Sequence, residues 1–421
     1  MFGSLNDKIF GNMKSISLTV IMAFVFVCGW AQVDHIIQMK EDVKYLASDK
    51  LEGRETGTKS EKKAAKYISK RMKKLGIIPA GLEGSYYQDF EFKPKPHPHA
   101  DSAEMAAVEP ISARNVIGYI DNNQSNLVVI GAHYDHLGYG AEGSLYKGEP
   151  AIHNGADDNA SGVALMLALA GYAQDNKDAN YLFIAFSGEE KGLWGSNYFM
   201  KNPTIDTSEI SYMLNFDMVG RLNEEKKLAI NGVGTSPVFI NDLQNANSDS
   251  TFKLILSESG VGPSDHTSFY LRGYPALHFF TGQHPDYHRP ADDWEKLNYE
   301  GMDLLRVYLE KLMTELNSEP DIPFSKTKDE ESRKAPKFSV TLGVVPDYLF
   351  DGEGMRIDGV SDGKPAQKAG IKAGDIVIRL GETEVTGMRS YMTALGAFNK
   401  GDQTEVEIIR DEEKIVLPLQ F

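Results

Sequence analysis

Short, predominantly apolar runs typical of buried β-strands alternate with helical segments between residues 115 and 280. The strand-like runs are residues 126–130, 181–186, 212–216 and 276–280, and the helical segments are residues 163–173, 193–200 and 237–246. Strands joined by crossover helices lie parallel and are covered on both faces. The alternation therefore predicts an α/β domain with a mixed, largely parallel sheet sandwiched by helices.

The chain outside this alternation divides into further units. Residues 38–75 are amphipathic and helical, with a glycine-containing break, and residues 299–316 predict a closing helix. Half of residues 318–337 are charged and three are proline, which indicates a linker. Short alternating strands follow over residues 338–421 and predict a small β-rich domain. We therefore expect two domains, residues 32–317 and 338–421.

Composition argues against several classes of function. The 421 residues include 44 lysines and arginines against 60 aspartates and glutamates, a formal charge of −16. This acidic excess argues against a broad electrostatic surface for nucleic acid or anionic lipid. The single cysteine, Cys28, excludes an internal disulfide framework and any cysteine-based zinc site. A metal in this protein must therefore be held by histidine, aspartate and glutamate.

Residues 1–31 have the pattern of a cleavable signal peptide. Two lysines precede an apolar run over residues 16–28, and the small residue Ala31 follows it. The run is too short for a comfortable transmembrane helix. We therefore expect cleavage near Ala31, export to the periplasm or the extracellular space, and no membrane span in the mature chain. Lipidation of Cys28 is an alternative use of the same segment.

Five segments rich in histidine and acidic residues follow or flank the predicted strands. They are residues 131–135, 154–162, 186–190, 215–218 and 286–290. In open α/β sheets, ligands bind at the carboxyl ends of the strands. A single histidine or aspartate at a strand end is usually a turn or cap residue. Five such segments in order on one α/β pattern indicate a common site.

These segments contain the donors for a two-metal site. The candidate ligands are His133, Asp157, Glu190, Asp217 and His288. Imidazoles and carboxylates suit Zn²⁺, with Co²⁺ or Mn²⁺ as substitutes, and one shared carboxylate can bridge two ions about 3.5–4 Å apart. Glu189 and Glu190 are adjacent and cannot both face one ion comfortably, so one can be a ligand while the other stays free as a general base. Asp135 is placed to accept the second ring proton of His133 and fix its tautomer.

The same segments resemble the motif set of the M28 zinc aminopeptidases over residues 38–316. The matching stretches are Leu51-Glu52-Gly53-Arg54 with Gly57, His133-x-Asp135, Gly155 to Gly162, Ser187-Gly188-Glu189-Glu190, Phe216-Asp217-Met218 and Tyr287-His288. The resemblance implies a zinc exopeptidase-like fold in which Asp157 bridges two Zn²⁺ ions. It places His133 and Asp217 on one zinc. Glu190 and His288 would hold the other.

The resemblance also implies roles outside the ligand set. Glu189 would be the general base, and Asp135 would orient His133. A cis peptide would join Asp157 to Asp158, and Asp158 would lie beside the ligands rather than on a metal. Such a bond is rare where proline is not involved.

Further residues near these motifs are expected to line or support the site. Ser264-Asp265-His266 resembles a family segment, so Asp265 and His266, with Tyr287, are expected to line the substrate cleft. No serine-nucleophile motif accompanies this segment, which argues against a catalytic triad. His278 lies inside a predicted strand and is expected in the core. The remaining histidines near the motifs, His136, His153 and His284, are expected to support the ligands or lie on the surface.

The C-terminal domain resembles the bacterial form of the PDZ domain over residues 338–421. The matching residues are Gly363-Lys364-Pro365-Ala366, Ala369-Gly370-Ile371, Gly374-Asp375 and Leu380-Gly381. Such domains bind an extended peptide as an added strand, with its terminal carboxylate in a cup of backbone amides. Leu342, Gly343 and Val344 are the candidate cup. A groove that is vestigial, or that packs on the peptidase domain, is the alternative.

Together these features predict an exported two-zinc aminopeptidase. It would hydrolyse the N-terminal bond of peptides with a free amino terminus through a metal-bridged water, with Glu189 moving the proton. Its expected partners are these peptides and a C-terminal peptide ligand of the PDZ-like domain, with no nucleic acid. The alternatives are a glutaminyl cyclase-like or carboxypeptidase-type M28 relative, and a non-catalytic peptide-binding scaffold that acts through the PDZ-like domain.

Overall fold

The computed structural model describes residues 35–93, 108–327 and 340–421, except 348–349, 351 and 361–362. The predicted signal peptide, residues 1–31, lies outside this part of the chain. Within the described residues, no helix combines the length and the apolarity that crossing a membrane requires.

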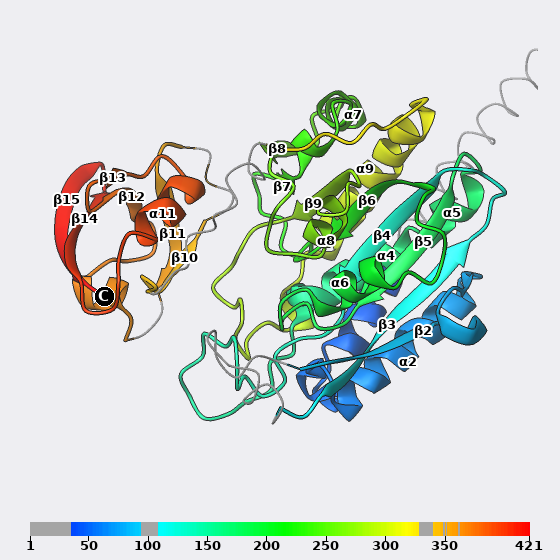
Figure 1. The fold of residues 1–421 in the computed structure, drawn as a ribbon, viewed down its shortest axis with the longest axis horizontal. Coiled ribbons are helices and arrows are strands. Elements are labelled where there is room, and N and C mark those ends of the chain that lie inside the picture. Colours follow the sequence, from blue (N-terminus) through cyan, green and yellow to red (C-terminus); the bar gives the residue numbers. More distant parts are fainter. Residues whose placement is uncertain (1–34, 94–107, 328–339, 348–349, 351, 361–362) are drawn as a thin grey trace, which may run out of the picture.

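A nine-stranded mixed sheet forms the centre of the first domain (Figure 1). Its strands are β1 (Ile78–Pro79), β2 (Tyr87–Phe92), β3 (Ile111–Ile120), β4 (Leu127–His133), β5 (Asn180–Phe186), β6 (Ile210–Phe216), β7 (Lys227–Asn231), β8 (Lys253–Ser257) and β9 (Ala276–Phe280). Their order is β1-β3-β5-β4-β6-β9-β7-β8, with β2 paired to β3. The four central strands β5, β4, β6 and β9 are parallel, whereas β3 joins β5, and β7 joins β9, antiparallel. The predicted mixed, largely parallel sheet is confirmed.

Helices cover both faces of this sheet. One face carries residues 35–46, α2 (Lys59–Lys74), α4 (Gly162–Ala168), α5 (Ala170–Asp175), α7 (Phe239–Ala246) and α9 (Tyr299–Ser318). The other face carries α6 (Trp194–Lys201) and α8 (His266–Tyr270). Every residue of β4, β5 and β9 is buried, as two covered faces require.

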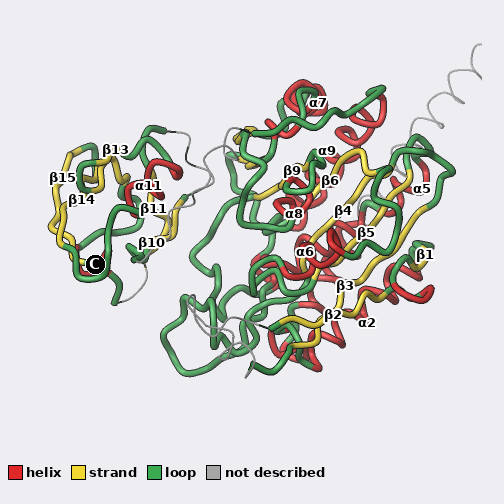
Figure 2. The backbone as a smooth tube through the Cα atoms, in the orientation of Figure 1, coloured by secondary structure: helices red, strands yellow, loops and turns green. Residues whose placement is uncertain are grey.

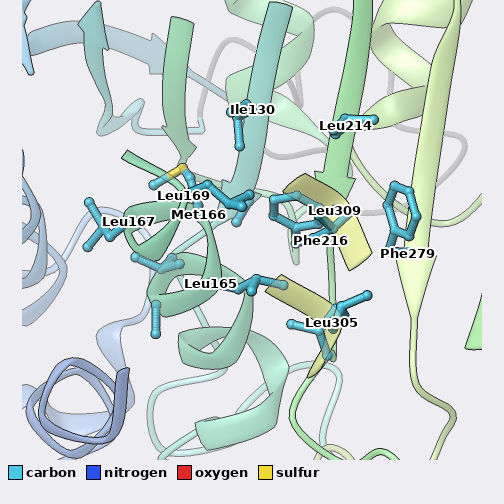
Figure 3. Packing of buried hydrophobic residues seen from close by; sticks show 14 of the residues in the cluster. Ile130, Leu165, Met166, Leu167, Leu169, Leu214, Phe216, Phe279, Leu305 and Leu309 are labelled. Carbon is cyan, nitrogen blue, oxygen red and sulfur yellow. The ribbon is translucent and has the colours of Figure 1, made fainter. Parts of the chain in front are cut away.

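Alternate strand residues supply two separate cores. Val128 and Ile130 of β4 join the larger core, whereas Leu127 and Val129 join the core under α6 and α8. Figure 3 shows the larger core, where Leu165, Met166 and Leu167 of α4 and Leu305 and Leu309 of α9 meet Ile130, Leu214, Phe216 and Phe279 of the sheet. This packing fixes the strands whose carboxyl ends carry the candidate site.

The C-terminal domain is a separate body built on an antiparallel sheet (Figure 1). Its strands are β10 (Val344–Pro346), β11 (Met355–Val360), β12 (Ile376–Leu380), β13 (Thr383–Glu384), β14 (Gln403–Arg410) and β15 (Glu413–Gln420), and its helices are α10 (Pro365–Ala369) and α11 (Met388–Leu395). The sheet order is β10-β11-β12-β14-β15, which leaves β10 as an edge strand. This domain confirms the predicted small β-rich fold.

Part of the segment predicted as a linker, residues 318–337, packs on the first domain instead. Ile322 is buried in the larger core, and the amide of Ser325 donates to the carbonyl of Thr235 at 2.8 Å. The Thr327 hydroxyl lies 2.9 Å from the hydroxyl of Tyr270. The high charge of this segment predicts a linker. Its composition therefore does not indicate that Ile322 and Thr327 contact the first domain. Residues 328–337 lie outside the described residues.

Candidate metal centre and active site

The four central strands bring the predicted acidic and histidine segments to one edge of the sheet. His133 is the last residue of β4, and Asp217 directly follows β6. Glu189 and Glu190 follow β5 by three and four residues. A long loop over residues 134–155 connects β4 to the π-helical turn Ala156–Ser161 (Figure 2).

The first candidate metal group consists of His133, Asp158 and Asp217. Nε2 of His133 lies 3.3 Å from Oδ1 of Asp158 and 3.3 Å from Oδ1 of Asp217. One donor atom from each of the three residues lies within 4.8 Å of the others. An imidazole nitrogen and two carboxylates at this spacing form a donor set that suits a divalent cation such as Zn²⁺.

The second candidate metal group shares Asp158 with the first. It joins Asp158 to Glu190 and His136, whose Nδ1 lies 2.8 Å from Oε1 of Glu190. His288 reaches the same pair, because its Nε2 lies 3.1 Å from Oδ2 of Asp158 and 3.4 Å from Oε2 of Glu190. Asp158 therefore presents Oδ1 to one group and Oδ2 to the other, the arrangement of a bridging carboxylate.

Asp157, which the family resemblance places between the two metals, does not lie between these groups. Its Oδ1 accepts a hydrogen bond from the Gly220 amide at 2.6 Å, and its Oδ2 lies 3.2 Å from Nε2 of His284. These partners hold the Asp157 carboxylate away from both groups, so Asp158, and not Asp157, lies where the bridging carboxylate is predicted. The cis peptide bond also lies one residue later than expected, between Asp158 and Asn159.

Two buried charged residues fasten the turn that carries Asp158. Oδ2 of Asp292 accepts hydrogen bonds from the amides of Asp157, at 2.9 Å, and Asp158, at 3.1 Å. The guanidinium of Arg54 is fully buried and donates to the carbonyl oxygens of Leu46, Tyr134, Asn154 and Gly155. Burial lowers the pKa of Arg54 to about 10, so it keeps its charge at neutral pH. Arg54 therefore ties the His133 loop to the Asp158 turn.

Replacing Arg54 with methionine is expected to lower the free energy of unfolding by about 3–5 kcal/mol, because four buried carbonyls lose their donor. The measurement is urea unfolding of both proteins. Arg272→Met is the matched control, since Arg272 is exposed in the same domain and its loss should cost no more than about 0.5 kcal/mol. Equal stabilities of the two variants would show that the buried hydrogen bonds contribute little.

Asp135 connects the candidate metal ligand His133 to the loop of the predicted base. Its Oδ1 accepts the amide of Glu189 at 3.2 Å and lies 3.8 Å from Nδ1 of His133, and its Oδ2 accepts the Thr56 hydroxyl at 2.8 Å. Burial acts to raise the pKa of Asp135, but these hydrogen bonds outweigh it and the pKa is lowered. Nδ1 of His133 also lies 3.3 Å from the backbone oxygen of Asp135.

Glu189 faces the first group without joining it. Its Oε2 lies 4.0 Å from Nε2 of His133, and its side chain is 11% exposed. Burial raises the pKa of Glu189 well above its ordinary value, His133 opposes the rise, and Asp217 and Glu190 add to it. A carboxylate in such a site takes up a proton readily, as general-base catalysis requires.

A cavity of about 460 Å³ opens in front of both groups. From the first domain it is lined by Leu145, Asp158, Glu189, Glu190, Asp217, Met218, Asn231, Pro263, His278, Phe280, Gln283, Tyr287 and His288. The ring of Tyr287 stacks on that of His288 at 3.8 Å, so Tyr287 lies where the sequence places a cleft residue. Asp265 and His266 are fully buried and are not among the lining residues.

His278 contributes to this cavity, although the sequence places it in the core. Its ring stacks on His266 at 4.7 Å, and its Nδ1 lies 3.1 Å from Nδ2 of Asn231. His278 is 3% exposed and belongs to β9, so it is both a strand residue and a residue of the cavity wall. Strand position alone does not reveal which buried histidines face a cavity.

The three residues predicted as the carboxylate cup of the C-terminal domain lie in two different environments in the structure. Leu342 is buried in the core of that domain, and its carbonyl accepts the amide of Ala366 at 2.9 Å. Gly343 and Val344 instead line the cavity in front of the metal groups. Gly343 has φ +77° and its amide lies 3.1 Å from the Thr341 hydroxyl oxygen, which accepts the hydrogen bond.

Models of known protein families match both domains of the chain. Residues 115–313 match the model of peptidase family M28, and residues 323–419 match that of the PDZ domain. The chain carries an M28 peptidase domain followed by a PDZ domain. The donor residues at the sheet edge, from His133 to His288, all fall within the first match.

Individual proteins are similar to about half of the chain. A probable leucine aminopeptidase 1 of Trichophyton verrucosum is 30% identical over 209 residues, covering 45% of this chain and 54% of the relative. Aminopeptidase YwaD of Bacillus subtilis is 27% identical over 203 residues, covering 45% and 41%. The chain thus spans about half the length of the curated relatives it matches.

Solved structures share the fold of the first domain. A zinc aminopeptidase from Bacillus subtilis superposes with a TM-score of 0.52 at 19% identity, covering 70% of this chain and 98% of that one. A Zn-dependent exopeptidase from Parabacteroides distasonis gives a TM-score of 0.54 at 17% identity, covering 67% and 98%. These superpositions support the same α/β architecture.

Proposed function

We propose that this protein is an exported two-zinc aminopeptidase. The observation that carries the proposal is the shared carboxylate of Asp158, which presents one oxygen to each of two groups of histidine and acidic side chains. The similarity to leucine aminopeptidases supports the substrate class, and the signal peptide predicted over residues 1–31 supports export.

The donor chemistry fits two zinc ions. His133 and Asp217 would hold one ion and Glu190 and His288 the other, with Asp158 on both. His136, at 2.8 Å from Glu190, would orient that ligand. When bound, the ions would act as Lewis acids that polarise the scissile carbonyl and activate water, and Co²⁺ or Mn²⁺ could substitute for zinc.

Glu189 is the residue that moves the proton in this proposal. It would take a proton from the attacking water and pass it to the leaving amine, so one carboxylate serves as base and then as acid. Asp135 holds the Glu189 amide and the His133 ring in a fixed relation.

Hydrolysis of an aminoacyl p-nitroanilide by the purified full chain tests this proposal. We expect activity on the free-amine reporter, at least about a hundredfold less on its N-acetylated form, and complete loss with a chelator that added Zn²⁺ reverses. Equal hydrolysis of the acetylated reporter would contradict aminopeptidase activity. Activity that survives chelation would contradict the metal site.

A further inference from the structure

The cavity in front of the candidate metal groups is built by both domains. Its lining from the PDZ domain consists of Thr341, Gly343, Val344, Pro346 and Lys364. Three of these belong to β10 or precede it directly, and β10 is the edge strand of the second sheet. A PDZ-type domain binds peptides by adding a strand at such an edge. The peptide-binding edge and the peptidase site therefore share one cavity.

The charges of this cavity differ between its two walls. The peptidase wall carries four carboxylates, those of Asp158, Glu189, Glu190 and Asp217. On the PDZ wall, Lys364 is the only lysine or arginine among the described residues that line the cavity. No ion pair joins Lys364 to another residue of the described ranges, so its ammonium group is available to a ligand.

Gly343 brings the cup loop close to this lysine. A Cβ atom on Gly343 would lie 2.2 Å from Cβ of Lys364, so only glycine allows the two segments to approach so closely. The positive φ of Gly343 also favours glycine there. The loop before β10 and the base of the Lys364 side chain therefore form one continuous surface on the PDZ side.

We propose that the PDZ domain forms the outer wall of the substrate site, where Lys364 binds the terminal carboxylate of a short peptide. This inference rests on the proposed aminopeptidase function. The amino end of the same peptide would then lie at the peptidase wall, beside the candidate metal groups and Glu189, the one carboxylate of that wall that the proposed function leaves off the metals. At about 460 Å³ the cavity falls in the range of sites that enclose drug-sized ligands. The substrate class is short peptides with both termini free.

The occupant is the substrate rather than a separate regulatory peptide because both walls enclose the same space. A peptide tail added to β10 would fill the cavity and block the metal groups. A tail of this kind would inhibit the enzyme, whereas a short substrate uses both walls at once. Inhibition by a longer C-terminal peptide is therefore an outcome of the test.

Steady-state kinetics on di- to hexapeptides, each with a free or an amidated carboxyl terminus, tests the proposal. For one peptide length we expect amidation to raise KM by about tenfold, as for loss of one charge-assisted hydrogen bond. The effect falls on KM because a carboxylate held away from the scissile bond contributes equally to substrate and transition state. In Lys364→Gln the KM ratio of amidated to free peptide falls to about one.

Two further variants make the result specific. Lys368→Gln removes an exposed lysine of α10 that does not line the cavity, and it should keep the tenfold ratio. Lys364→Glu should reverse the preference, because a carboxylate there repels the free terminus. Equal KM values for free and amidated peptides in the wild type at every length would overturn the proposal. The proposal would also be overturned if a longer peptide inhibited reporter hydrolysis while the substrates showed no length preference.

Failure of this inference is distinguishable from failure of the proposed function. Loss of the amidation effect with normal hydrolysis of the aminoacyl reporter would overturn only the role of the PDZ wall. Absence of reporter hydrolysis in the zinc-loaded wild type would overturn the aminopeptidase function itself.

Discussion

Replacing Glu189 with glutamine is expected to lower kcat on an aminoacyl reporter by about a thousandfold while two zinc ions stay bound. Glutamine has the same size but cannot accept a proton, and Glu189 faces the first group at 4.0 Å without belonging to either metal group. The measurements are kcat and the zinc content of the dialysed variant.

Glu190→Gln is the matched control for this variant. Glu190 lies within 3.4 Å of both His136 and His288, so its loss should remove zinc as well as activity. Full activity of Glu189→Gln would remove Glu189 from the role of base. Loss of zinc from Glu189→Gln to the same extent as from Glu190→Gln would assign Glu189 to the metal instead.

Replacing Asp158 with asparagine is expected to reduce bound zinc from two ions to one or fewer and activity by about a thousandfold. Asp158 offers one carboxylate oxygen to each group, and an amide supplies neither the charge nor the second oxygen. The loss corresponds to several kcal/mol of transition-state stabilisation. Zinc content and kcat/KM are measured on the same preparation.

Asp157→Asn separates the two neighbouring carboxylates. The oxygen of asparagine can still accept the Gly220 amide, so this variant should keep both zinc ions and most of its activity. Its cost should appear in the free energy of unfolding, because Asp157 is fully buried. The opposite pattern, with zinc lost from Asp157→Asn and kept in Asp158→Asn, would restore Asp157 as the bridging residue.

The position of the site on the sheet follows from local sequence pattern. The continuous apolar runs of β4, β5, β6 and β9 predict parallel strands, and parallel strands bring their carboxyl ends to one edge. Polar residues at the ends of such runs or within a few residues of them, such as His133, Glu190 and Asp217, are therefore predictable as neighbours. Their distances to Asp158 depend on the loops.

The direction of individual side chains does not follow from such patterns. Asp157 and Asp158 are adjacent carboxylates in one turn. The Gly220 amide and His284 hold the Asp157 carboxylate away from the metal groups, while Asp292 accepts the backbone amides of both residues. These partners lie 63 to 135 residues away in the chain. For His136 the sequence predicts only a residue that supports the ligands or lies on the surface, because one histidine in a loop carries no spacing signal.

Contacts between segments that are distant in the chain account for the remaining differences between the sequence-based predictions and the structure. Arg54 lies about 100 residues from the turn that it holds, and its motif gives no indication of which carbonyls it reaches. The linker likewise has a polar composition, yet Ile322 and Thr327 pack on the first domain. The cavity between the two domains is lined by residues of both, so the sequence pattern of neither domain predicts it.

Zinc stoichiometry, measured together with activity, tests the central proposal most directly. The metal-free full chain is titrated with Zn²⁺, and hydrolysis of an aminoacyl reporter is followed at each step. We expect saturation at two zinc ions per chain, and Asp158→Asn should lose the two-ion end point. Full activity at one zinc ion per chain would contradict the two-metal site and favour a glutaminyl cyclase-like enzyme.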